Sequence, residues 1–117
     1  MLKVNPVSNT GNQLYFYVYN ETDERMWFTC SYNVFDQNNS ILNCKPSIHL
    51  ANPCVIQEVD KQDNKCFAID LGVDVHQISH IEFIITEQQV HFDSRKKTNI
   101  FRFRLICDKW EEIDVGN

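Results

Sequence analysis

The stretch that decides the fold class is Ile100-Phe101-Arg102-Phe103-Arg104-Leu105-Ile106-Cys107. Its apolar residues alternate with arginines, so the two phenylalanines and Leu105 share one face, and Arg102 and Arg104 share the other. A period of two is typical of a β-strand with one buried and one solvated side. Cys107 continues the apolar face, and we expect its thiol to be buried there.

Four other stretches have the same strand character. They are Gln13–Tyr19, Met26–Phe35, Cys66–Leu71 and His80–Thr86. Polar segments rich in Asn, Asp, Gln and Ser predict the turns between strands. Because Asp36–Ser40 contains no glycine, we expect an asparagine there in the left-handed region. We predict an all-β fold, a two-sheet antiparallel β-sandwich of about seven or eight short strands.

The length of 117 residues suits one two-layer core and is too short for two. We therefore predict a single β-sandwich domain over residues 1–117, in which residues 1–12 are either a flexible lead-in or an edge strand. The pattern is weakest between Lys45 and Asn64, where Cys54–Val59 is a candidate strand. Residues 108–117 indicate either a short turn of helix or a final strand.

The formal net charge of −5 argues against nucleic-acid binding, because a phosphate backbone favours clustered Lys and Arg. No apolar run is long enough to span a membrane, and residues 1–14 lack the charge and apolar order of a signal peptide. The odd number of cysteines, five, and the lack of a Cys-x-x-Cys pair argue against a disulfide framework. We expect a cytoplasmic protein without membrane or nucleic-acid partners, with most cysteines buried.

The sequence contains no motif for catalysis. It has no Gly-rich phosphate loop, no Gly-x-Ser-x-Gly and no His-Glu-x-x-His. His76 and His80 would lie about 13 Å apart in an extended segment, which is too far to share a zinc ion. We therefore predict a protein that is not an enzyme and that has no cofactor of its own.

Two groups of side chains are candidates for binding a protein partner. Tyr15, Tyr17 and Tyr19 share one strand face, and tyrosine is enriched at protein interfaces. The alternative is that the strand with these tyrosines is central and that both of its faces are covered. The second group is basic and consists of Arg95, Lys96, Lys97, Arg102 and Arg104. It would attract an acidic partner surface, unless these residues form only a solvated loop and strand face. The sequence leaves open whether the protein forms a homo-oligomer.

The order of strands in the C-terminal half resembles that of a known family. It runs Phe67-Ala68-Ile69-Asp70-Leu71, Val73–Ile78, His80–Thr86 and Ile100–Ile106, and Ser31–Ile41 adds a strand, a turn with Asp and a second strand. In this order and spacing the chain resembles the TerD-like tellurium-resistance and stress-response family. The resemblance implies a β-sandwich that binds calcium through two acidic segments.

The chain differs from that family at the acidic segments. The first reads Phe28-Thr29-Cys30-Ser31 and has no carboxylate, whereas the second offers Asp60 and Asp63 as candidate calcium ligands. Calcium takes six to eight oxygen ligands, so other loops would have to complete such a site.

These observations predict a non-catalytic, protein-binding β-sandwich that resembles a diverged TerD-like stress-response domain. An alternative of another class is a small acidic inhibitor or immunity protein, encoded by a phage or mobile element, which blocks a partner enzyme by covering its surface. A third is a metal-dependent enzyme or sensor that uses Cys and His.

Overall fold

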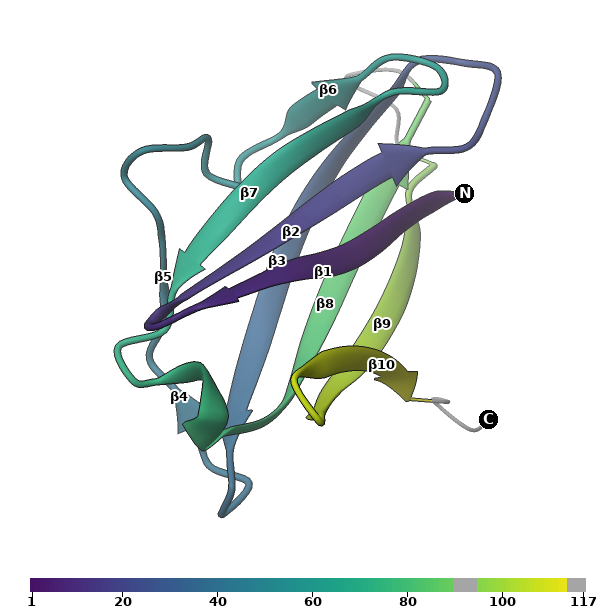
Figure 1. The fold of residues 1–117 in the computed structure, drawn as a ribbon. Coiled ribbons are helices and arrows are strands. Elements are labelled where there is room, and N and C mark those ends of the chain that lie inside the picture. The colour runs from purple at the N-terminus through teal and green to yellow at the C-terminus, as the bar shows by residue number, and fades with distance from the viewer. Residues whose placement is uncertain (90–94, 114–117) are drawn as a thin grey trace.

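A computed structural model describes residues 1–89 and 95–113, without the side chains of residues 8–10. It is a two-layer antiparallel β-sandwich, which confirms the predicted fold class (Figure 1). In the described residues no helix is long and apolar enough to cross a membrane. The helical structure of these residues is a single 3-10 turn, η1, over Val75–Gln77.

The first sheet has the strand order β1-β2-β7-β5. Its strands are β1 (Leu2–Thr10), β2 (Gln13–Asn20), β5 (Lys45–Pro46) and β7 (Asn64–Asp70). The second sheet has the order β10-β9-β8-β3-β4, and β6 also pairs with β3. Its strands are β3 (Met26–Asp36), β4 (Ile41–Leu42), β6 (Gln57–Val59), β8 (Ile78–Gln88), β9 (Lys97–Ile106) and β10 (Lys109–Ile113).

The core forms where the inner faces of the two sheets meet. The inward side chains of β2 are fully buried, as its alternation predicted. Phe16 of the first sheet lies 4.7 Å from Phe83 of the second, measured between ring centroids, and Phe28 lies 6.0 Å from Phe67. Aromatic pairs of this kind add about 0.5–1.5 kcal/mol beyond the area they bury, so these rings fix one layer on the other.

The N-terminal residues form an edge strand, the second of the two alternatives that the sequence left open. β1 is the last strand of the first sheet and pairs with β2. Pro6 pairs with Phe16 and Ser8 with Tyr15, so Val7 is an extra residue and forms a bulge. Proline, which lacks an N–H, is tolerated in a sheet at an edge or a bulge, and this strand provides both.

The prediction that Cys107 is buried is wrong. β9 ends at Ile106, and Cys107 and Asp108 form the two-residue turn to β10 with φ angles of 50° and 63°. A type I′ hairpin turn has positive φ at both central positions, and Cys107, at the first of them, is exposed. The alternation of apolar residues gives the facing of a strand but not the residue at which the strand ends.

Other sequence predictions in the turns and weak regions have mixed outcomes. Asn39 has φ of 62°, which confirms the left-handed asparagine predicted in that turn. The candidate strand at Cys54–Val59 is shorter than predicted, because only β6 is extended there. The cysteines are more exposed than predicted: Cys30 is buried, Cys44 and Cys66 are partly buried, and Cys54 and Cys107 are exposed.

Candidate binding surfaces

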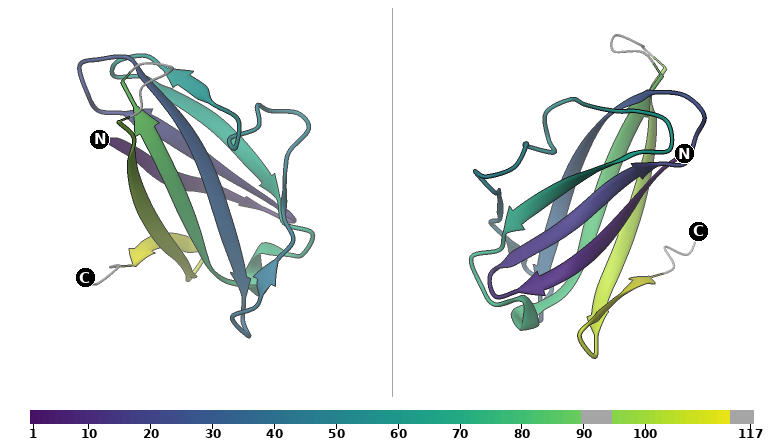
Figure 2. Two further views of the ribbon diagram at one scale, coloured as in Figure 1. Left: turned by 180° about the vertical axis from the view of Figure 1, so that it is seen from behind. Right: turned by 45° about the horizontal axis from the view of Figure 1, so that its top comes forward.

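The structure places the predicted binding residues on opposite outer faces of the sandwich. The outward tyrosines belong to β2 in the first sheet, and Arg102 and Arg104 belong to β9 in the second; Figure 2 shows the two layers from both sides. We call these surfaces the tyrosine face (Tyr15, Tyr17 and Tyr19, with Asn5 and Asn64 beside them) and the arginine face (Asn33, Phe35, His80, Glu82, Arg102 and Arg104). The packed core lies between them, so a compact partner that contacts one face does not reach the other.

A row of three polar side chains crosses the arginine face. The register of the strands sets Asn33 beside Glu82, and Glu82 beside Arg102. The Nε of Arg102 donates to Oε2 of Glu82 at 2.8 Å, and Nδ2 of Asn33 donates to Oε1 at 3.2 Å. The hydrogen bond from Arg102 is the main reason that the pKa of Glu82 lies below its usual range. Both carboxylate oxygens of Glu82 are therefore already engaged.

The neighbouring row on the same face contains Phe35, His80 and Arg104, and Glu111 of β10 continues it beyond Arg104. The ring of His80 stacks on Phe35 with centroids 4.4 Å apart and an angle of 12° between planes. Burial lowers the pKa of His80, and Arg104 and Arg102 lower it further, so the imidazole is neutral near pH 7. Arg104 is exposed and makes no ion pair with any described residue. It is thus a cation next to an aromatic stack.

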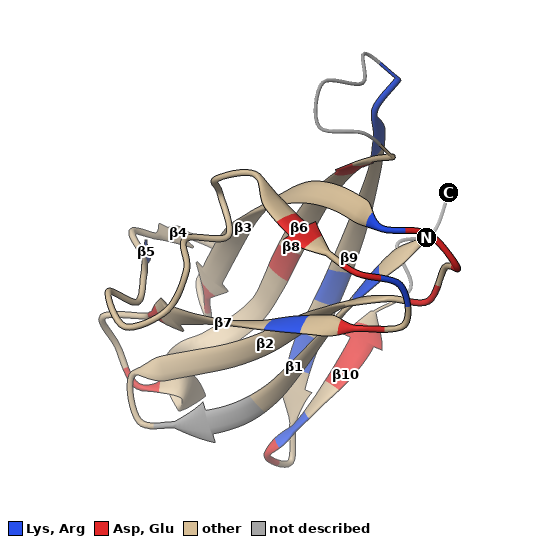
Figure 3. Cartoon of the chain, turned by 90° about the horizontal axis from the view of Figure 1, so that it is seen from above, with Lys and Arg blue, Asp and Glu red and all other residues tan. Residues whose placement is uncertain are grey.

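The other predicted basic residues lie at the far end of β9. From Lys97 to Arg102 the strand advances about 17 Å, and Figure 3 shows basic positions along it. Arg95 and Lys97 line a shallow hollow of about 270 Å³ together with Glu87, and Lys96 lines another hollow of about 210 Å³. The structure therefore brings Arg102 and Arg104 together but does not join them to Arg95, Lys96 and Lys97 in one compact patch.

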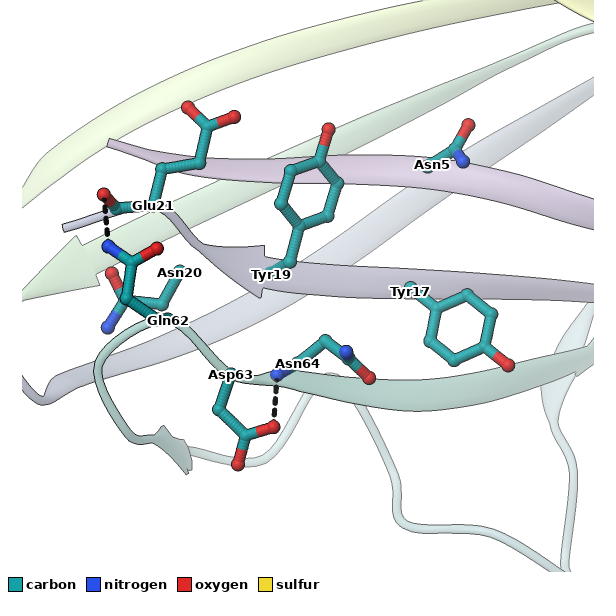
Figure 4. Close-up of a pocket in the computed structure, with 8 residues that line it drawn as sticks. All are labelled: Asn5, Tyr17, Tyr19, Asn20, Glu21, Gln62, Asp63 and Asn64. Atoms are coloured by element: carbon teal, nitrogen blue, oxygen red, sulfur yellow. Dashed lines mark hydrogen bonds between the residues drawn. The ribbon is translucent and has the colours of Figure 1, made fainter.

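The tyrosine face contains a larger hollow of about 410 Å³, drawn in Figure 4. Tyr17 and Tyr19 line this hollow, and Tyr15 does not. The hydroxyl of Tyr15 donates to Oε1 of Gln13 at 3.0 Å. The partial exposure of this face shows that the outer side of β2 is not covered, although β2 is a central strand.

The two candidate calcium ligands are exposed in the turn between β6 and β7, where both bind the backbone. Oδ1 of Asp60 accepts from the N–H of Lys61 at 2.8 Å, and Oδ1 of Asp63 accepts from the N–H of Asn64 at 2.8 Å. Within residues 1–89 and 95–113, no group of three or more His, Cys, Asp or Glu residues is placed to hold a metal ion.

Sequence reasoning missed Phe35, His80, Glu82 and Asn33 as parts of a surface. Alternation indicates that these side chains point outward, but it does not indicate which strands are neighbours. Only the strand order and the register align them with Arg102 and Arg104. The signal that could have found them is the pairing of an outward Glu on one strand with an outward Arg on another.

The strand order matches that of a known sandwich type. The first sheet corresponds to strands A, B, E and D of an immunoglobulin-type domain, and β9, β8 and β3 correspond to G, F and C. No protein-family model matches the sequence, and no curated protein matches it significantly.

Two solved structures show the same architecture. One is the ASH/PapD-like domain 7 of human CEP192, with 7% identity, a TM-score of 0.52, and coverage of 86% of this chain and 80% of that one. The other is WR4, an MSP family member of C. elegans, with 15% identity, a TM-score of 0.52, and coverage of 87% and 94%. The chain has the fold of these immunoglobulin-like sandwiches.

This finding overturns the TerD-like resemblance. The solved structures that the chain resembles are PapD-like and MSP domains, not TerD-like ones. The strands that suggested TerD-like proteins follow a period-2 pattern common to many β-sandwiches, so they identify a fold class and not a family. The stress-response and tellurium-resistance roles, and the calcium site that the resemblance implied, lose that support.

Proposed function

We propose that this protein is a non-catalytic binding module that holds an acidic protein partner on its arginine face. The observation that carries the proposal is Arg104, which is exposed and has no ion pair among the described residues, although Glu111 of β10 lies opposite it in the register, on a face where Glu82 is already paired with Arg102. An acidic side chain of a partner would find in Arg104 an available cation with five N–H donors.

The neighbours of Arg104 have the composition of an interface centre. Phe35 and His80 present a stacked aromatic pair, and Ile100 on the same face is 43% exposed. Arginine and aromatic residues are enriched among the side chains that dominate binding energy. All of these side chains project from paired strands, which hold them in place before a partner arrives.

A catalytic role is less well supported than binding. Oγ of Ser79 lies 3.1 Å from Nδ1 of His80, a pair that could in principle form a nucleophile and its base. Such a pair needs a third group that orients the imidazole, and no acid among the described residues hydrogen-bonds the ring of His80. The stacking on Phe35 instead gives this histidine a packing role.

The test is affinity capture with matched charge reversals, followed by mass spectrometry and direct binding measurements. The Arg104→Glu protein should lose a specific partner that the unmodified protein retains. The control is Lys61→Glu, which changes the net charge equally at an exposed turn away from the arginine face. Added salt should weaken the interaction. Equal retention by both variants would overturn the proposal. If the captured partner is an enzyme, its activity with and without this protein tests the inhibitor alternative.

A further inference from the structure

The hollow on the tyrosine face is a second candidate site, separate from the arginine face. Its volume of about 410 Å³ falls in the range of roughly 300–1,000 Å³ that is usual for small-molecule sites. Two aromatic rings, four amides and two carboxylates line it: Tyr17, Tyr19, Asn5, Asn20, Gln62, Asn64, Glu21 and Asp63.

Rigid strands position the rings and their nearest amides. Tyr17 and Tyr19 project from the same side of β2, about 7 Å apart along the strand. The register sets Asn5 of β1 beside Tyr17 and Asn64 of β7 beside Tyr19, so each ring has an amide on a neighbouring strand. Figure 4 shows the ring of Tyr19 extending toward β1 and that of Tyr17 toward β7, with Asn5 on β1 and Asn64 on β7. The two tyrosine rings and these two amides are therefore in position without any movement of a loop.

One wall of the hollow is fixed by a buried asparagine. Asn20 is 2% exposed, and its Nδ2 donates to the carbonyl of Glu24 at 2.7 Å and to that of Asp60 at 3.2 Å. These bonds join the β2–β3 loop to the β6–β7 turn. Nε2 of Gln62 donates in the same way to the carbonyl of Glu21 at 2.9 Å. The two loops that carry the carboxylates are thus tied to each other.

Several polar groups of the hollow remain available to a ligand. The side-chain amides of Asn5 and Asn64 and the hydroxyls of Tyr17 and Tyr19 make no hydrogen bond to another described residue. The carboxylate of Glu21 is likewise available, and Asp63 uses one oxygen for the N–H of Asn64. The site therefore offers donors and acceptors next to two ring faces.

The chemistry of the lining selects the ligand class. Lys and Arg are absent from the lining, although Lys3 of β1 pairs with Tyr19, and two carboxylates are present, which disfavours a phosphate or other anion. An organic cation would use the rings and carboxylates but would leave the amide donors unmatched. A neutral polyhydroxylated ring uses the tyrosine rings, the carboxylates and the amides. Its C–H face packs on tyrosine, and its hydroxyls both donate and accept hydrogen bonds. We propose that this hollow binds a carbohydrate, with a sugar ring packed against Tyr17 and Tyr19.

The test is an NMR titration of the full-length, ¹⁵N-labelled protein with methyl glycosides of glucose, galactose, mannose and N-acetylglucosamine. We expect at least one glycoside to bind with a Kd on the order of 1 mM and to shift the backbone amides of Asn5, Tyr19 and Asn64. The Tyr19→Ala protein should bind about tenfold more weakly or not at all. Tyr15→Ala is the matched control, because it removes a tyrosine from the same strand face outside the hollow, and it should bind normally.

Three results would overturn the proposal. The first is that no glycoside shifts these amides at concentrations up to about 50 mM. The second is that Tyr15→Ala and Tyr19→Ala weaken binding equally, which would locate the ligand elsewhere. The third is that tetramethylammonium shifts the same amides whereas the glycosides do not, which would assign the hollow to an organic cation. Circular dichroism of each variant establishes that it is folded.

Discussion

Reversing the charge of each outward arginine of β9 should separate the two residues by their effect on stability. Arg102→Glu removes the hydrogen-bonded ion pair with Glu82. Charge-assisted hydrogen bonds contribute about 1.5–3 kcal/mol, but the Arg102 side chain is 39% exposed, and solvent screening reduces this to about 1 kcal/mol. The new carboxylate also faces Glu82; two like charges about 4 Å apart repel by about 1 kcal/mol in water and by more near a protein surface.

The expected loss for Arg102→Glu is therefore about 2–3 kcal/mol. Arg104→Glu breaks no ion pair among the described residues and adds only a like-charge neighbour, Glu111 on β10, so the expected loss is about 0.5 kcal/mol. A domain of this length has a stability of roughly 6–18 kcal/mol, and both variants should remain folded. Arg104→Glu is for this reason the cleaner probe of partner binding.

The assay is equilibrium unfolding in urea, followed by the fluorescence of Trp27 and Trp110. With an m-value of about 1–3 kcal/mol/M, the midpoint for Arg102→Glu should fall by about 1–2 M, and that for Arg104→Glu by much less. Arg102→Gln separates the loss of the ion pair from the repulsion by Glu82, because it removes the ion pair without adding a negative charge. Equal losses for the two glutamate variants, or a larger loss for Arg104→Glu, would refute the assignment of the paired and unpaired arginine.

Three further predictions concern the core, an unpaired amide and a histidine. Phe16→Ala should cost about 3–5 kcal/mol in urea unfolding, whereas Tyr17→Ala, on the outer face of the same strand, should cost less than about 1.5 kcal/mol. Nδ2 of Asn99 is buried and has no hydrogen-bond partner among the described residues, so Asn99→Leu should leave the unfolding free energy unchanged or raise it by about 1 kcal/mol, and a loss above 1 kcal/mol would contradict this. A hydrogen bond to Asp108, at 2.9 Å, and a second one to Asp74 raise the pKa of His76 in the folded protein. The stability that His76 contributes is therefore complete below the pKa of the unfolded chain and is lost as the pH rises through the pKa of the folded protein. An NMR titration should place the midpoint of His76 above about 6.5 and show a lower midpoint in Asp108→Asn.

The sequence predicted the fold through the facing of individual strands. In β2 and β9 the alternation is regular, and the inward residues it selected, such as Phe16 and Phe103, are buried in the structure. This works because the side-chain period of a strand is fixed by backbone geometry and does not depend on its neighbours. Cys107 marks the limit, since the end of β9 depends on the turn to β10 and not on the period.

The candidate surfaces were less predictable, because they depend on which strands lie side by side. Tyr17 and Arg104 were selected correctly as outward residues, but their separation on opposite faces follows from the assignment of β2 and β9 to different sheets. The hollow beside Tyr19 depends further on Asn20, whose side chain ties together two loops distant in sequence. No local pattern contains this information.

The bulge at Val7 has a consequence for how copies of this protein meet at high concentration. A straight, uncovered margin of a sheet is a template on which an identical chain can stack, and repeated stacking leads to fibrils. Here Pro6 supplies no amide hydrogen to such a stack, and the extra residue after it bends the backbone away from the flat geometry that growth requires. The first strand is thereby protected against ordered aggregation while its inner side still completes the sandwich.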